Sequence, residues 1–135
     1  MYRDLATATW AGIEASANAR IDPPDLKISD DRKTLIATFA DGTAHDLTAE
    51  MLRVMSPSAE VQGHSPDQRV TLGGKRNVQI KDLRPVGNYA VRIVFDDTHD
   101  TGLYGWDYLR TLGDEKDARW AVYEAELKEK GLSRD

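Results

Sequence analysis

The stretch that decides the fold is Asn88–Leu112, which reads NYAVRIVFDDTHDTGLYGWDYLRTL. Apolar and polar residues alternate from Tyr89 to Phe95, the period of two that is typical of a strand with a buried face. A polar loop at 96–102 then leads back into a short apolar segment, 103–105. After this segment, apolar residues recur at helical spacing, at Trp106, Leu109 and Leu112. A strand, a loop and the start of a helix therefore follow one another here.

Length and composition favour one small domain. The chain has 135 residues, no cysteine and a formal net charge of −5. We expect residues 1–22 to be a tail or weak helix, and residues 23–131 to form a single domain that includes a C-terminal helix. The lack of cysteine excludes disulfides, thiolate metal sites and cysteine nucleophiles. With no signal peptide or membrane-length apolar run, the sequence predicts a cytoplasmic protein that binds neither membranes nor nucleic acid.

The remaining elements predict an α+β fold, because strands dominate the middle of the chain and a helix ends it. Asp41-Gly42 predicts a type I′ hairpin between 34–39 and 43–47, and Thr48 is a good cap for a short helix at 49–55. We expect one small antiparallel sheet, with the C-terminal helix packed on it. Its further strands are expected at 78–83, 89–95 and 101–105; a short strand at 70–72 and a C-terminal helix at 114–130 complete the prediction.

Two segments carry residues with possible chemistry. His99 lies among Asp96, Asp97 and Asp100, and carboxylates beside an imidazole can bind a metal or tune a general base. The spacing fits no standard site, and such a loop can equally use its Asp and Thr side chains to satisfy turn amides. The segment 73–76 lacks the first glycine and the final hydroxyl of a phosphate-binding loop, which favours a solvated basic corner.

Several pieces of this sequence together resemble the gamma-butyrobetaine hydroxylase-like N-terminal domain, also called DUF971, in its stand-alone bacterial form. The pieces are the Asp-Gly hairpin, Leu-Arg before Ser-Pro-Ser, PVGNYA, and the pattern H-x-T-G-x-Y-x-W-x-x-L-R within residues 25–112. The resemblance implies the fold. In the dioxygenases of this family, the domain that this chain resembles precedes a separate iron and 2-oxoglutarate catalytic domain. There it holds a structural zinc, bound by a Cys-x-Cys-x-x-Cys loop and one histidine.

The zinc ligands of those relatives fall on Ser56, Ser58, Val61 and His99 of this chain. Hydroxyls and a valine cannot replace thiolates, so the resemblance implies a degenerate site. We therefore expect no metal and no other cofactor.

Two classes of function remain open. The first is a non-catalytic protein-binding or accessory module with no catalytic residue and a protein partner that the sequence does not identify. Its predicted interaction patch consists of Glu60, His64, His99, Asp100 and Tyr104, with Tyr104 as aromatic anchor. The second is a metal-dependent or 2-oxoglutarate-linked enzyme component built on His99, its neighbouring acids and His64. The domain also resembles a module attached to P-loop iron–sulfur scaffold proteins, which makes an accessory factor in iron–sulfur protein assembly a further alternative.

Overall fold

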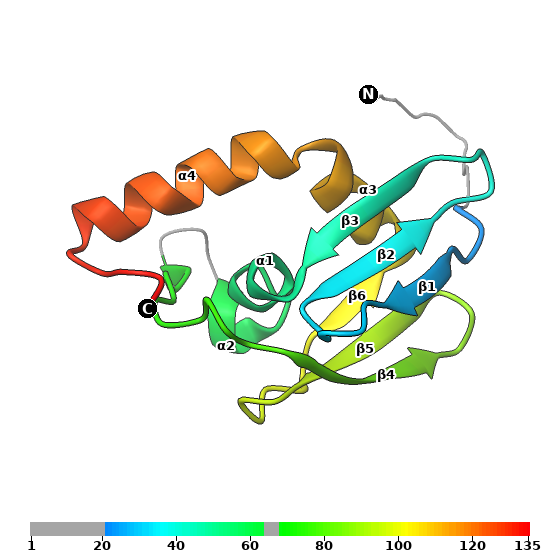
Figure 1. Cartoon of the computed structure of the whole chain (residues 1–135), viewed down its shortest axis with the longest axis horizontal. Helices are drawn as coiled ribbons and strands as arrows, with labels where there is room; N and C mark the ends of the chain where they lie inside the picture. The colour runs from blue at the N-terminus through cyan, green and yellow to red at the C-terminus, as the bar shows by residue number, and fades with distance from the viewer. Residues whose placement is uncertain (1–20, 64–67) are drawn as a thin grey trace.

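A computed structural model describes residues 21–63 and 68–135. The predicted tail or weak helix at 1–22 therefore lies largely outside the described residues. The loop residue His64 lies wholly outside them. The described part is an α+β domain, as the sequence predicts, with two three-stranded antiparallel sheets and flanking helices (Figure 1). None of its helices is long and apolar enough to cross a membrane.

The first sheet contains β1 (Asp25–Ile28), β2 (Thr34–Thr38) and β3 (Ala44–Thr48), in that order. The predicted hairpin between β2 and β3 is confirmed, but its turn is not type I′. Gly42 has a φ of 88°, whereas Asp41 has no positive φ. The loop instead closes through Phe39, whose amide donates to the Thr43 carbonyl at 2.8 Å. Only the last residue of this three-residue loop needs the left-handed conformation, and glycine supplies it.

The second sheet contains β4 (Ile80–Val86), β5 (Ala90–Phe95) and β6 (Leu103–Gly105). The expectation of one sheet is wrong in this respect, because the strands divide between two sheets. Pro85 lies within β4, which is tolerated because this strand is at an edge. The predicted strand at 70–72 is also wrong, since that segment lies in neither sheet.

In the described ranges, four α-helices accompany the sheets: α1 (Ala49–Val54), α2 (Ala59–Gln62), α3 (Trp106–Asp114) and α4 (Lys116–Glu129). The predicted Thr48 cap is confirmed, because its hydroxyl accepts a bond from the amide of Met51 at 3.1 Å. Helix α2 was not expected from the sequence, and it begins after a second such cap, Ser58.

The two sheets and α3 share the main core. Leu35 and Leu47 come from the first sheet, Val91 and Ile93 from the second, and Leu109 from α3. The helices α1 and α3, rather than the predicted helix 114–130, supply the buried helical residues of this core. Figure 1 shows α4 lying beside α1, away from the strands.

A second, smaller cluster fixes α4 in that place. Tyr123 and Leu127 of α4 are buried against Val54 of α1. Trp120 is only partly buried and touches both clusters. The C-terminal helix thus closes one side of the domain and leaves open space beside α1.

Candidate functional site

Residues 56–62 and 97–101, far apart in the sequence, meet at one end of the domain. Ser56 Oγ lies 3.0 Å from His99 Nε2, and Ser58 Oγ lies 2.8 Å from Thr101 Oγ1. Gly102 allows this approach, because a Cβ at that position would lie 2.4 Å from Ser56 Oγ. The structure therefore places Ser56 against His99, two of the four positions to which the resemblance assigns zinc ligands.

Both ring nitrogens of His99 are engaged. Nδ1 lies 3.1 Å from Glu60 Oε1, and the His99 side chain is 3% exposed. An ionised carboxylate only accepts hydrogen bonds, so Nδ1 carries the proton and Nε2 accepts the bond from the Ser56 hydroxyl. Burial lowers the pKa of His99 and the charge of Arg53 lowers it further, while Glu60 acts in the opposite direction.

The order Ser56, His99, Glu60 is that of a serine hydrolase triad. A nucleophile of this kind must reach a substrate carbonyl, yet Ser56 has no exposed surface. Its hydroxyl oxygen also accepts a bond from the amide of Ser58, at 3.2 Å. The arrangement is therefore an internal hydrogen-bonded chain that joins the two segments.

The acids next to His99 do not converge on its ring. Asp97 accepts bonds from Arg53 Nε at 2.7 Å, Lys75 Nζ at 2.6 Å and the His99 amide at 3.1 Å. Burial alone would raise the pKa of Asp97, but these bonds outweigh it and keep the pKa low. Asp96 accepts a bond from the amide of Gln79. The Asp97 carboxylate is thus already occupied by two cations and an amide.

The residues at the four positions to which the resemblance assigns zinc ligands do not fit that metal. They offer two serine hydroxyls, one valine and one imidazole, whereas zinc in such a site requires thiolates or further imidazoles. In the described part of the chain, no three His, Cys, Asp or Glu residues gather closely enough to hold a metal ion.

The predicted interaction patch must be corrected. Tyr104 has no exposed surface, because it pairs with Val91 on the core side of β6 and donates its hydroxyl to the carbonyl of Leu52. It cannot be an exposed anchor, and burial raises its pKa. His99 is also buried, while Glu60 is exposed and Asp100 half-buried. His64 lies outside the described residues, so the five do not form one described surface.

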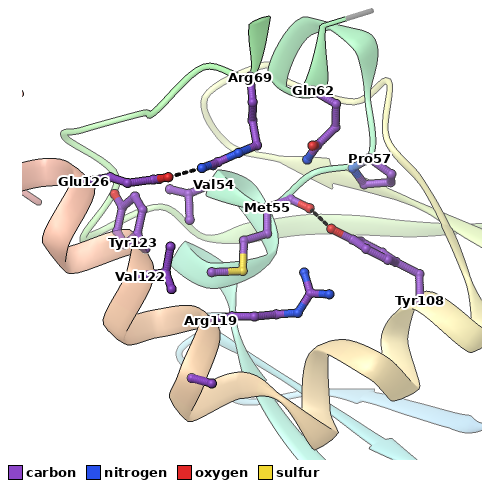
Figure 2. A pocket seen from close by; sticks show the side chains of 11 residues that line it. Val54, Met55, Pro57, Gln62, Arg69, Tyr108, Arg119, Val122, Tyr123 and Glu126 are labelled. Carbon is purple, nitrogen blue, oxygen red and sulfur yellow. Dashed lines mark hydrogen bonds and ion pairs between the residues drawn. The ribbon is translucent and has the colours of Figure 1, made fainter. Parts of the chain in front are cut away.

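An open groove of about 580 Å³ lies on the other side of Pro57, a feature that the sequence analysis missed (Figure 2). Val122 of α4 lines it and is 57% exposed. Tyr108 is held in place because its hydroxyl donates to the carbonyl of Met55 at 2.6 Å. The apolar or aromatic side chains of the lining are Val54, Met55, Pro57, Tyr108, Ala118, Val122 and Tyr123.

Charged side chains border this groove in pairs. Arg69 forms an ion pair with Glu126 on one side, and Arg119 lies on another (Figure 2). Arg119 also donates to Glu115, at 3.0 Å. Both arginines therefore have carboxylate partners. The sequence signal for this groove is the helical spacing of Ala118, Val122 and Glu126. These residues form a second helix face beside the one that Tyr123 and Leu127 bury.

Comparison with known proteins identifies the class of this small α+β domain. The model of the family "Gamma-butyrobetaine hydroxylase-like, N-terminal" matches residues 26–110. The chain belongs to this family. A search of the curated proteins finds no significant match.

Solved structures agree with this assignment. One solution structure is 46% identical over 87% of this chain and 92% of the other, with a TM-score of 0.74. A second is 40% identical over 92% and 91% of the two chains, with the same TM-score. A crystal structure of a protein of unknown function from the DUF971 family of Acidithiobacillus ferrooxidans is 33% identical. That match covers 72% of this chain and 98% of the other, with a TM-score of 0.58.

Proposed function

We propose that this domain is a non-catalytic protein-interaction module that binds an apolar side chain of a partner protein in the groove between α1 and α4. The observation that carries the proposal is the exposure of Val122 beside an open, largely apolar groove of about 580 Å³. Apolar side chains left in a concave, partly open site are typical of binding surfaces. An accessory role beside an oxygenase or an iron–sulfur assembly protein is one form that such binding would take.

The composition of the groove supports a protein partner over an anionic ligand. Its arginines, Arg69 and Arg119, are already paired with Glu126 and Glu115. The net charge of −5 also disfavours phosphate backbones. Tyrosine, methionine and arginine around an apolar centre are the residues that protein interfaces favour. A segment of a partner that presents one large aliphatic or aromatic side chain, with polar groups beside it, matches this lining.

The geometry of the hydrogen-bonded chain supports the non-catalytic part of the proposal. Ser56 is fully buried, and both nitrogens of the His99 ring are used within the domain. A general base must reach a substrate proton directly or through one water. In this arrangement the imidazole holds the 56–62 segment beside the groove, and Pro57 and Gln62 of that segment form part of the lining.

The test places a charge in the groove. Val122→Asp should weaken binding, because an ionised carboxylate is costly to desolvate against apolar walls. Leu103→Asp is the matched control, since Leu103 is 46% exposed on β6 and does not line the groove. Affinity capture with quantitative mass spectrometry, followed by binding measurements on the purified partner, compares them with the unmodified domain.

The expected result is a partner that binds the unmodified domain and Leu103→Asp equally, and binds Val122→Asp at least about tenfold more weakly. Equal binding by both variants would mean that the groove is not the interaction surface.

A further inference from the structure

Residues 132–135, which follow α4, fold back along residues 74–76 and here are called the tail (Figure 1). The amide of Gly74 donates to the carbonyl of Ser133, and the amide of Arg76 donates to the carbonyl of Arg134, both at 2.9 Å. The two donors lie in a bend and turn outside both sheets, and they bind two consecutive carbonyls of the tail. Gly73 allows the approach, because a Cβ there would lie 2.7 Å from the Ser133 carbonyl oxygen.

Arg134 is the specific element of the tail. Its Nε and Nη2 donate to the two carboxylate oxygens of Glu50, at 2.8 and 2.7 Å. This bidentate geometry is strong and selects arginine over lysine. The guanidinium carbon also lies 5.3 Å from the ring centre of Trp120, within the range of a cation–π contact. Glu50 and Trp120, with the amides of Gly74 and Arg76, form what we call the tail site.

The tail contributes almost nothing to the core. Leu132 is 42% exposed, and the Asp135 side chain is 72% exposed although it pairs with Arg76. Exposed ion pairs of this kind stabilise little. No residue of the tail belongs to the two hydrophobic clusters, so the tail can leave without opening the core provided that another cation replaces Arg134 at Glu50, whose side chain is 6% exposed.

The acidic surroundings of the tail site favour a positively charged ligand. A hollow of about 390 Å³ adjoins it, and Trp120 and Arg134 form part of the wall. Its other lining residues include four carboxylates against one lysine: Asp46, Glu50, Asp117, Glu124 and Lys116. A basic segment that continues past the arginine would meet this acidic wall.

We propose that the tail site binds an extended, basic segment of a partner protein through one arginine, and that residues 132–135 occupy the site until that segment displaces them. The partner's arginine takes the place of Arg134 between Glu50 and Trp120, and its backbone accepts the bonds from Gly74 and Arg76. This inference does not depend on the groove around Val122, which uses a different face of α4.

The test uses the full chain with Arg134→Ala, which keeps the tail but removes its arginine. The probes are two acetylated and amidated peptides, one copying residues 132–135 and one with alanine in place of its arginine. Binding is followed by NMR, through the amide signals of Gly74 and Arg76 and the indole signal of Trp120.

The arginine peptide should bind Arg134→Ala at least about tenfold more tightly than it binds the unmodified chain, which is about 1.4 kcal/mol. The alanine peptide should not bind, and adding Glu50→Gln should abolish binding of the arginine peptide. If Arg134→Ala remains folded and no signal shifts, or if both peptides bind alike, the proposal is wrong.

The unmodified protein supplies a second measurement that does not depend on the fold of a variant. An excess of the arginine peptide should slow hydrogen exchange of the Gly74 and Arg76 amides, and unchanged exchange would contradict the proposal. A dimer that forms with the unmodified chain but not with Arg134→Ala would show that the occupant is the tail of a second copy. That result would replace the proposed partner.

Discussion

His99 links two segments of the chain through a ring that is neutral and buried. In a protonated ring both nitrogens carry hydrogen, so Nε2 could no longer accept the bond from Ser56 Oγ. The hydrogen-bonded chain therefore depends on the neutral state of the ring. The carboxylate of Glu60 partly compensates, but burial and the charge of Arg53 dominate and lower the pKa. This balance makes the stability of the domain depend on pH.

The first prediction concerns that dependence. Because the folded pKa lies below the unfolded value of about 6.5, the unfolded state binds more protons as pH falls. The contribution of His99 should be complete above pH 6.5 and decrease below it. Urea unfolding should therefore give a lower free energy at pH 5.5 than at pH 7.5. His99→Gln should show a weaker decrease over this interval, and an equal decrease in both proteins would contradict the account.

Tyr104 provides a second prediction at the scale of one residue. Tyr104→Phe removes the buried hydroxyl that donates to the carbonyl of Leu52. We expect a loss of about 1–3 kcal/mol in the free energy of unfolding, because a buried acceptor loses its partner. Tyr89→Phe is the control, since Tyr89 is 59% exposed and should change stability by less than about 0.5 kcal/mol. If the two variants are equally stable, the Tyr104 hydroxyl does not form a buried hydrogen bond and is instead exposed to water.

At the scale of elements, the segment around α2 and the loop between β5 and β6 lie in contact, joined by the Ser56–His99 and Ser58–Thr101 hydrogen bonds. Ser56 faces His99 directly, and Val61 of α2 is buried. If the resemblance to a zinc-binding domain holds at these positions, the chain differs from it in the ligand atoms, because hydroxyls and a valine stand where thiolates are expected.

The third prediction follows from this reasoning. The combined substitutions Ser56→Cys, Ser58→Cys and Val61→Cys should create a Cys₃His site with His99 that binds one zinc ion per chain. Elemental analysis and thermal unfolding with and without a chelator measure the outcome. Adding His99→Ala to the three substitutions should weaken the binding. A folded triple variant without zinc would show that the two segments are not close enough to share a metal.

Local signals in the sequence were sufficient for several elements. Thr48 and the spacing of Trp106, Leu109 and Leu112 predicted α1 and the buried face of α3, because capping and helical periodicity depend on near neighbours. The division into two sheets was not predictable in this way, because pairing between distant strands leaves no local pattern.

The site was harder to predict than the fold. Leu103 and Tyr104 are both apolar in a three-residue strand, and only the pairing of Tyr104 with Val91 decides which one is buried. The groove forms where Val122 and Tyr108 come from different helices. The tail site joins Arg134 to Glu50, 84 residues away. Each of these features depends on tertiary contacts that a sequence pattern does not encode.

At the scale of the whole molecule, two surfaces lie on different faces of α4. One is the apolar groove beside Val122, and the other is the polar site where Trp120 meets the tail. Between them, Tyr123 and Leu127 attach the helix to α1. The helix thus separates the two surfaces that we propose for recognition, one by apolar insertion and one by arginine pairing.

Site-specific photo-cross-linking tests the central claim most directly. A benzoylphenylalanine at position 122 would lie in the groove, whereas the same residue at position 103 would lie on β6, and the native residues are 57% and 46% exposed. In cells, position 122 should give a discrete adduct with one partner protein, and position 103 should not give it. No adduct at 122, or the same adducts at both positions, would contradict binding through the groove.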